Sequence, residues 1–403
     1  MRDVAVLGVG MHPWGKWGRD FVEYGVVAAR AALADAQLDW RDVQLVSGAN
    51  TIRNGYPGFV SGSTFAQALG WTGARIVSNY AACASGAVAL SVAREYILSG
   101  ACDVALVIGA DTTPKGFLAP TAGERKADLD WLRFHLVGAT NPTFFGLYAR
   151  RRMDLYGATA ETFAEVRVKN GRHGAENPNA RYRKPPTVEE VLASPIVADP
   201  LHLFDICATS DGAAAVVLTS LDYAARKSSR PVKLRAVSTV TPTFPNRIVD
   251  LPNLGTDPVP TKMSANSGTA DGTTGTTFKK SIARAAYEEA GLGPKDLSLA
   301  EVYDLSSALE LDWYEDIGLC AEGEAESLLL SGATAVGGRV PVNASGGLAS
   351  FGEAVPAQAL AQVCELTRQL RGQAGSRQIE DARVGLAVNQ GLFGHGSGTI
   401  LVK

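Results

Sequence analysis

A cysteine stands where a predicted strand turns into a helix, and this position favours nucleophilic chemistry. Cys83 follows the strand-like run 76–79 and comes directly before a helix that begins at about Ala84. The N-terminus of a helix presents unpaired N–H groups and partial positive charge, which stabilise a thiolate and lower the pKa of the thiol. A cysteine among alanines also fits a small buried apolar group, so both interpretations stay open at this point.

A second group of candidates is a set of cations in the stretch from about 112 to 200. The stretch is rich in Asn, Pro and Gly, and its cations include Arg150, Arg151, Arg152, Arg167, Lys169, Arg172, His173, Arg181, Arg183 and Lys184. One interpretation is a solvated helical cap. The other is a lid whose arginines and lysines bind a phosphorylated ligand, because these are the usual partners of phosphate.

The elements that must position these residues repeat within the chain. Ala29–Ala32 and Ala283–Ala286 share the sequence Ala-Arg-Ala-Ala, and the following residues agree again at Ala36, Leu38, Asp42 and Leu45 against Ala290, Leu292, Asp296 and Leu299. Alanine-rich helices can resemble one another by chance. Against chance, each of these helices leads into an apolar strand, and the order of the later elements also agrees, which indicates an internal repeat.

The repeat predicts an α/β protein with two halves of the same βαβαβαββ plan, at 1–230 and 231–403. Strands that alternate with helices favour a parallel or mixed sheet with helices on both sides. We expect two such sheets packed face to face. The helix 84–93 has small or apolar residues on every face, so it should lie between them at the centre of the molecule. The stretch 112–200 would be an insertion into the first half.

Composition excludes several classes of protein. The chain has 403 residues, of which 46% are hydrophobic and 20% charged, as in ordinary globular proteins. A net charge of −3 gives no support for binding nucleic acid or a membrane surface. The five cysteines form no CxxC pair, which argues against disulfides and a zinc site. Without an apolar run of ~18 residues or a signal peptide, we expect a cytoplasmic protein with no membrane span and no metal.

Four motifs, in order along the chain, resemble the thiolase superfamily, and in particular its sterol carrier protein type, the lipid-transfer protein branch. Cys83–Gly86 resembles the nucleophile motif, Ser210–Ala214 the Ser-Asp-Gly-Ala-Ala strand, and Glu301–Asp304 the segment Glu-Val-His-Asp. The stretch 343–354 resembles the run from Asn-Pro-Ser-Gly-Gly to Gly-His-Pro. The resemblance implies a thiolase-like fold with αβαβα layers, an acyl-CoA substrate whose coenzyme A is the only cofactor-like group, and a homodimer formed through the strand 76–79.

Departures from the family pattern lie at the catalytic positions. Tyr303 replaces the first catalytic histidine, and Glu353 replaces the histidine of Gly-His-Pro. Near the C-terminus, Asn389–Gln390 replaces His-Asn, and His395 is displaced into a Gly-His-Gly run. In an ordinary thiolase one histidine activates the cysteine and the other helps to hold the thioester oxyanion. The resemblance therefore implies that this chain lacks both groups.

A tyrosine at this position favours a different reaction. A phenol has a pKa of ~10, so at neutral pH it donates or relays a proton. This suits retro-aldol cleavage, in which a β-hydroxyl loses its proton while the bond to the thioester α-carbon breaks. Backbone N–H groups near Cys83 and Gly396 would stabilise the resulting enolate. Some thiolase-like aldolases that cut steroid side chains as CoA thioesters are similar in having this tyrosine and Gly-Glu-Ala, although Val355 stands here where they have a second tyrosine.

The predicted site residues fall into three groups. The catalytic candidates are Cys83, Tyr303, Glu353 and His395; the candidates for holding the oxyanion or the substrate are Asn343, Gly396 and Asp304; the candidates for binding coenzyme A are Arg183, Lys184 and Ser345. The alternative for Tyr303 is a core aromatic with a satisfied hydroxyl, and for Glu353 a buried carboxylate at the start of a helix. His395 lies between two glycines near the predicted oxyanion hole.

Three functions remain in view. The first is retro-aldol cleavage of a β-hydroxyacyl-CoA with a bulky, steroid-like acyl group, completed by a small partner with a zinc ribbon and an OB-fold, as the resemblance implies. The second is a degradative thiolase that uses Cys83 as nucleophile, with Glu353 or His395 as base. The third is a non-catalytic subunit that binds acyl-CoA or lipid.

Overall fold

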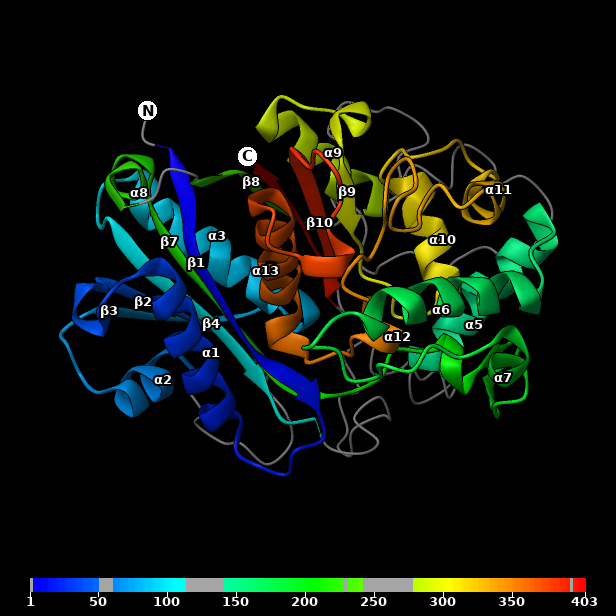
Figure 1. Ribbon diagram of the computed structural model, residues 1–403, viewed down its shortest axis with the longest axis horizontal. Helices are drawn as coiled ribbons and strands as arrows, with labels where there is room; N and C mark the ends of the chain where they lie inside the picture. The colour runs from blue at the N-terminus through cyan, green and yellow to red at the C-terminus, as the bar shows by residue number, and fades with distance from the viewer. Residues whose placement is uncertain (1–2, 51–60, 114–140, 228–230, 242–277, 392–393) are drawn as a thin grey trace, which may run out of the picture.

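The computed structural model describes residues 3–50, 61–113, 141–227, 231–241, 278–391 and 394–403. The predicted boundary between the halves at residue 230 and part of the predicted insertion, residues 114–140, lie outside the described residues. Two sets of strands and helices make up the body, and a group of helices lies to one side of it (Figure 1).

The first half forms one part of the sheet. Its strands lie in the order β3-β2-β4-β7-β1, with β3, β2 and β4 parallel and the remaining pairs antiparallel. The elements of this half are β1 (Val4–Gly15), α1 (Phe21–Ala36), β2 (Leu45–Asn50), α2 (Ser61–Leu69), β3 (Arg75–Tyr80), α3 (Ser85–Leu98), β4 (Val104–Asp111), β7 (Asp211–Ser220) and α8 (Leu221–Lys227).

The second half repeats the same plan. Its strands continue the sheet in the order β8-β11-β10-β9, and Val342 pairs in parallel with Ala300 beyond β9, where the first half has β3. Its principal elements are β8 (Val232–Val240), α9 (Phe278–Ala290), β9 (Leu299–Glu301), α10 (Ser307–Asp316), α11 (Ala325–Leu330), α12 (Gly347–Ser350), α13 (Gln358–Arg371), β10 (Val384–Gly391) and β11 (His395–Val402). Counted along the chain, the strands of each half lie in the order third, second, fourth, fifth and first, so the predicted repeat is confirmed.

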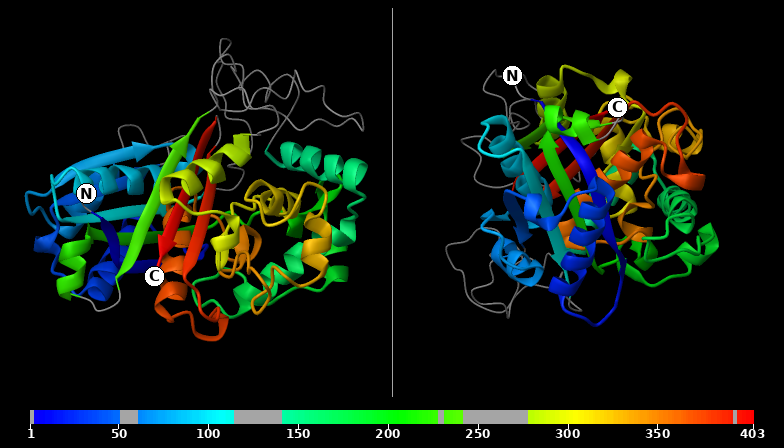
Figure 2. Two further views of the ribbon diagram at one scale, coloured as in Figure 1. Left: turned by 90° about the horizontal axis from the view of Figure 1, so that it is seen from above. Right: turned by 60° about the vertical axis from the view of Figure 1, so that its left-hand side comes forward.

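The sequence suggested two separate sheets, whereas in the structure the strands of the two halves are joined. A short antiparallel pairing of Ala5 with Lys233 and Val6 with Val232 joins β1 to β8, so the strands form one nine-stranded sheet. The helices α3 and α13 contact strands of both halves, while α1 packs on β1 and β7, and α9 packs on β8 and β11 (Figures 1 and 2). The predicted layers, with central helices between the two parts of the sheet, are thus present.

Small residues are required at this centre because the backbones approach closely. A Cβ atom on Gly109 of β4 would lie 2.3 Å from the carbonyl oxygen of Pro356, and one on Gly86 of α3 would lie 2.9 Å from the same atom. Pro356 belongs to the turn Val355–Ala357 that leads into α13. The run of small residues after Cys83 therefore reflects close packing of the two halves. This agrees with the prediction that the helix 84–93, which has no polar face, lies at the centre of the molecule.

The predicted insertion forms a cap beside the second half. It contains α5 (Asn141–Tyr156), α6 (Ala160–Ala175), α7 (Val188–Leu192) and a hairpin of β5 (Ile196–Ala198) with β6 (Leu201–His202). The interpretation of its cations as solvated is wrong for Arg152, which is fully buried and binds Asp312, Glu315 and Glu326 at 2.7 Å each. Arg152 therefore attaches the cap to α10 and α11.

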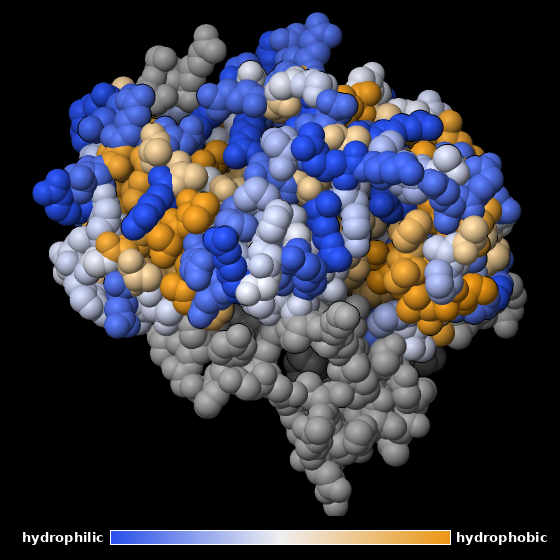
Figure 3. All heavy atoms as spheres, turned by 60° about the horizontal axis from the view of Figure 1, so that its bottom comes forward, coloured by the Kyte–Doolittle hydropathy of each residue, from blue (hydrophilic) through white to orange (hydrophobic). Residues whose placement is uncertain are grey.

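The surface is consistent with the composition. On the face shown in Figure 3, polar and charged side chains separate two apolar areas. Among the described residues, no helix has the length and apolar character needed to cross a bilayer. The five cysteines are all unbridged, and the described part of the chain holds no group of three or more side chains suited to bind a metal.

Candidate active site

Cys83 lies in a short turn, Ala82–Ala84, between the end of β3 and the start of α3. Ala82 has a left-handed backbone with φ of 47°, which an alanine rarely adopts. The end of β10 packs directly on this turn, because a Cβ on Gly391 would lie 2.3 Å from the carbonyl oxygen of Ala81 and 3.3 Å from the amide nitrogen of Cys83. The strained turn and the close approach of Gly391 fix the thiol of Cys83 at the helix start.

Tyr303 and Glu353 meet in the interior although fifty residues separate them. Tyr303 follows β9, and its hydroxyl donates a hydrogen bond to Oε1 of Glu353. Each side chain is 1% exposed. Backbone bonds hold Glu353 on the segment before β7, since its N–H donates to the carbonyl of Ala208 at 2.9 Å and its carbonyl accepts from the N–H of Ser210 at 2.7 Å. Tyr303 and Glu353, which stand where the family motifs have histidines, thus contact each other in the structure.

The thiol of Cys83 belongs to the same cluster. It contacts the Tyr303 hydroxyl, and the pKa of that phenol is raised well above 10.0 by burial, by Cys83 and by Glu353. An ionised phenolate is disfavoured here because water is excluded and a carboxyl group stands close. Tyr303 is therefore a protonated phenol at neutral pH, suited to pass a proton on rather than to hold a negative charge.

Cys207 completes the cluster and is the residue that the sequence argument missed. Its thiol is hydrogen-bonded to Glu353, and burial, then the nearby Glu353, raises the pKa of the thiol well above 9.0. Its backbone N–H donates to the carbonyl of Leu305 at 3.0 Å, which ties it to the Tyr303 segment. A signal was available, because Cys207 stands three residues before the Ser210–Ala214 motif. Cys83, Tyr303, Glu353 and Cys207 together combine two thiols, a phenol and a carboxyl group.

Two predicted positioning residues lie behind Tyr303 rather than within this cluster. Asn343 accepts a hydrogen bond from the Val302 N–H at 2.8 Å and donates to Glu310 at 2.9 Å, so its amide supports the strand that carries Tyr303. Asp304 accepts from the Leu348 N–H at 2.9 Å and from the Asn170 amide at 3.1 Å. Both residues therefore orient Tyr303, and a direct contact with substrate stays a prediction.

The charges of this supporting network are balanced by a lysine of the cap. Lys169 of α6 forms a buried ion pair with Glu310, which also accepts a hydrogen bond from Tyr314 at 2.5 Å. Lys169 lowers the pKa of Glu310, whereas burial and the neighbouring Glu310 raise the pKa of Asp304 well above 3.8. We infer that the pair carries one negative charge, on Glu310, and that Asp304 favours its protonated form.

His395 and Gly396 lie on opposite faces of β11. His395 pairs with Gly391, and directly opposed residues of an antiparallel pair project to the same face, so its side chain lies on the Cys83 side of the sheet. Gly396 faces the other way, since a Cβ there would lie 2.4 Å from the Ile282 side chain of α9. The register therefore places the His395 side chain on the side of Cys83, and the role of the Gly396 backbone N–H at the oxyanion stays a prediction.

The three candidates for binding coenzyme A are placed differently. Ser345 is 5% exposed, and its hydroxyl donates to Glu301 at 2.5 Å, so it serves the interior of the second half. Arg183 and Lys184 are exposed on the segment between α6 and α7. The two cations remain accessible to a ligand, whereas the Ser345 hydroxyl is occupied by Glu301.

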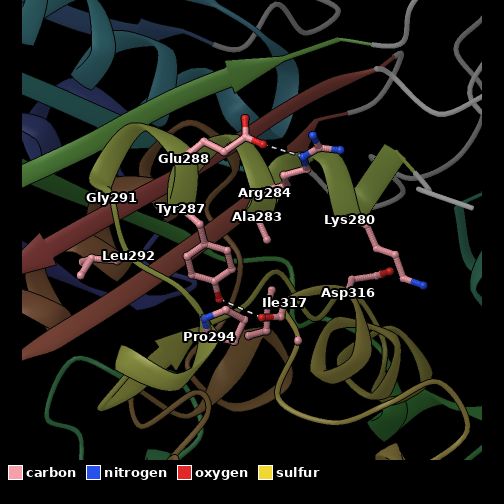
Figure 4. Close-up of a pocket in the computed structure, with 11 residues that line it drawn as sticks. Lys280, Ala283, Arg284, Tyr287, Glu288, Gly291, Leu292, Pro294, Asp316 and Ile317 are labelled. Carbon is pink, nitrogen blue, oxygen red and sulfur yellow. Dashed lines mark hydrogen bonds and ion pairs between the residues drawn. The ribbon is translucent and has the colours of Figure 1, made fainter. Parts of the chain in front are cut away.

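A pocket of about 360 Å³ opens between α9 and α10, away from these residues (Figure 4). Tyr287 crosses it and donates a hydrogen bond to the Ile317 carbonyl at 2.8 Å. None of the four cluster residues lines this pocket. We therefore locate the candidate chemistry at the buried cluster between the halves.

Comparison with protein families agrees with this architecture. Residues 19–222 match the model described as "Thiolase, N-terminal domain", and residues 261–403 match "Thiolase C-terminal domain-like". The chain is 34% identical to sterol carrier protein 2 of Homo sapiens over 98% of this chain and 71% of the relative. It is 32% identical to acetyl-CoA acetyltransferase of Methanothermobacter thermautotrophicus, covering 98% of this chain and 97% of the relative.

A solved structure is also similar over nearly the whole chain. The structure titled "Ltp2-ChsH2(DUF35) aldolase" matches with a TM-score of 0.79 and 26% identity, covering 99% of this chain and 97% of the other. Two other solved structures, an SCP2-thiolase-like protein of Mycobacterium smegmatis and an acetyl-CoA acetyltransferase of Syntrophomonas wolfei, share the fold at 18% and 17% identity with TM-scores of 0.67 and 0.69.

Proposed function

Because this chain belongs to the thiolase family, whose members act on acyl-CoA thioesters, we propose that it is an enzyme that breaks the Cα–Cβ bond of a β-hydroxyacyl-CoA by retro-aldol cleavage. The observation that carries the proposal is the hydrogen bond from Tyr303 to Glu353 beside Cys83. None of the four residues in the cluster is a histidine, and we assign the proton transfers to the phenol of Tyr303 and the carboxyl group of Glu353.

The proposed reaction begins with proton transfer. The β-hydroxyl of the substrate gives its proton to the Tyr303 oxygen while the phenol proton moves to Glu353, so the phenolate that burial disfavours never accumulates. The Cα–Cβ electron pair becomes the enolate of the thioester, and the β-carbon leaves as an aldehyde or ketone. The proton held by Glu353 returns to the α-carbon of the enolate, which yields a shortened acyl-CoA without added water, oxidant or free CoA.

Stabilisation of the enolate is assigned to the start of α3. The Cys83 amide lies at the N-terminus of this helix, where backbone dipoles favour negative charge. In this scheme Cys83 forms no bond to the acyl group. Its thiol fills the space beside Tyr303 and helps to keep the cluster free of water.

The substrate class and partners belong to the same proposal. The likeness to a structure titled as an aldolase supports aldol-type cleavage, and the resemblance of the catalytic motifs makes a bulky, steroid-like β-hydroxyacyl-CoA the first ester to test. That title also names a DUF35 component, which supports a partner subunit for this chain; its zinc-ribbon and OB-fold character rests on the resemblance of the motifs. Coenzyme A enters as part of the substrate, and the proposed active form is a homodimer that meets this partner.

A degradative thiolase is the second candidate. Cys83 is retained at the helix start, and a relative named acetyl-CoA acetyltransferase is 32% identical. In that reaction Cys83 would attack a β-ketoacyl-CoA, with Glu353 or His395 as base. A non-catalytic subunit that binds acyl-CoA is the third candidate.

The test is mass spectrometry of products from matched β-hydroxyacyl-CoA and β-ketoacyl-CoA esters, with and without free CoA and a DUF35-type partner. The proposal expects an aldehyde or ketone together with a shortened acyl-CoA from the hydroxy esters, at a rate independent of free CoA. Cleavage of only the keto esters, with consumption of free CoA, would establish the thiolase reaction instead. Binding without turnover in every combination would favour the third candidate.

A further inference from the structure

The buried cations of the cap are not equally paired. Arg152 meets three carboxylates, and Lys169 meets Glu310. Arg167 of α6 is only 5% exposed, yet its Nε and Nη1 atoms have no hydrogen-bond partner among the described residues. A buried guanidinium without an acceptor is costly, so such a group calls for an explanation.

The space around Arg167 is shaped to hold the guanidinium. A Cβ at Gly171, one helical turn later, would lie 3.0 Å from Nη1 of Arg167 and 2.8 Å from the ring of Pro186. Any side chain at position 171 would therefore compete with the guanidinium for this space. Glycine costs a helix interior about 1 kcal/mol relative to alanine, and at this position it leaves room for the buried guanidinium of Arg167.

The two carboxyl groups that act on Arg167 electrostatically form no ion pair with it. Asp205 and Asp304 act on it only through space, and no ion pair within 4.0 Å is formed with either. Asp205 already accepts from the His202 N–H at 2.9 Å and from the Ser307 hydroxyl at 3.2 Å. Burial raises the pKa of both carboxyl groups, and it lowers the pKa of Arg167 to about 10, which leaves the arginine charged at neutral pH.

The position of Arg167 connects it to the candidate active site. Arg167 lies three residues before Asn170, so both lie on one face of α6. Asn170 donates to Asp304, the residue after Tyr303, at 3.1 Å. On the outer side, the exposed cations Arg183 and Lys184 precede the Pro185–Pro186 turn that packs on Gly171. Arg167 is therefore linked on one side to the segment that carries Tyr303 and on the other to the segment that carries the two exposed cations.

We propose that Arg167 forms the base of an anion-binding subsite that accepts a carboxylate or phosphate group of the ligand. The planar guanidinium can bind either group through two parallel hydrogen bonds, and Nε and Nη1 are the donors available. The presence of the subsite follows from Arg167 itself. The statement that its anion belongs to an acyl-CoA rests on the proposed function.

The subsite can be tested without turnover. Inorganic phosphate or sulfate should raise the melting temperature of the wild-type protein and should raise that of Arg167→Met much less. Arg172→Met is the matched control, because Arg172 is exposed on the same helix and should respond as the wild type does. Without added anion, Arg167→Met should melt no lower than the wild type, since an unpaired buried charge has been removed. Equal anion responses in all three proteins would overturn the proposal.

Ligand titrations then identify the source of the anion. Calorimetry would compare CoA, dephospho-CoA, a pantetheine thioester and acyl-CoA esters with and without a carboxylate on the acyl chain. Arg167→Met removes a charge-assisted hydrogen bond, so it should weaken binding about 10- to 100-fold for the ligand that carries the recognised anion. It should change little the binding of the matched ligand that lacks this anion. If Arg167→Met weakens binding only of ligands that carry the phosphates, the subsite binds coenzyme A. If it weakens binding only of esters with a carboxylate on the acyl chain, the subsite binds the acyl chain. Equal affinities of both proteins for every ligand would contradict the subsite, whether or not the enzyme cleaves its substrate.

Discussion

Acid should destabilise this protein through one buried histidine, His173, whose surroundings require the neutral ring. Its Nδ1 donates to the carbonyl of Asn343 at 3.0 Å, and its Nε2 accepts from the Val336 N–H at 3.0 Å. Both nitrogens are thus used in the neutral form. Burial, with a smaller contribution from Lys169, lowers the pKa of His173 from 6.5 to about 4.

The sign and size of the effect follow from linkage. The unfolded chain binds a proton at His173 from about pH 6.5 downward, whereas the folded protein does so only near pH 4, so stability is lost as pH falls through this window. A difference of this size corresponds to about 2 kcal/mol at pH 5, and to about 3 kcal/mol below pH 4. Protonation of His173 should also disturb the candidate active site, because His173 is bonded to Asn343, which supports the segment that carries Tyr303.

Urea unfolding of the wild type and of His173→Gln between pH 8 and pH 5 measures this contribution. The variant will have a different stability at pH 8, so the quantity to compare is the change with pH. The wild type should lose about 2 kcal/mol more than the variant over this range. The same pH dependence in both proteins would refute the assignment of the effect to His173.

Three further predictions concern separate parts of the molecule. Gly391→Ala should lower kcat with the fold retained, because the new Cβ displaces the turn that holds Cys83. An unchanged kcat would show that the close approach of Gly391 to Ala81 has no catalytic effect. Arg152→Met should destabilise the protein by about 3 to 5 kcal/mol in denaturant titrations, because three buried carboxylates lose their cation; a loss under 1 kcal/mol would contradict the buried network. Light scattering at micromolar concentration should show a dimer that Ile76→Lys weakens, since β3 is an edge strand of the sheet; a monomeric wild type would refute this.

The sequence predicted the architecture well because the repeat left direct marks on it. Ala29–Ala32 and Ala283–Ala286 lie in α1 and α9, and each helix packs on the outer face of its own half. The short join of β1 to β8 was not predicted, because two residue pairs leave no pattern in the sequence. The burial of Arg152 was missed for a related reason, since its carboxylates lie more than 150 residues away.

The candidate site was predicted in part. Cys83, Tyr303 and Glu353 were chosen at motif positions, and the structure brings them into contact. Cys207 was missed because its contact with Glu353 depends on the path of the chain before β7. Asn343 was chosen as a residue that holds the oxyanion or the substrate, which stays a prediction; the bonds of its amide to Val302 and Glu310 were not foreseen, because motif order alone does not specify them.

The central claim is that cleavage depends on Tyr303 and Glu353 rather than on an acyl-cysteine. The most direct test compares kcat of Tyr303→Phe and Cys83→Ala on a β-hydroxyacyl-CoA that the wild type cleaves. Loss of proton transfer should lower kcat of Tyr303→Phe by ~10² to 10⁴, while Cys83→Ala should lose far less because no covalent intermediate forms. Complete loss in Cys83→Ala with near wild-type turnover by Tyr303→Phe, or equal and complete loss in both with CoA-ester binding retained, would contradict the account.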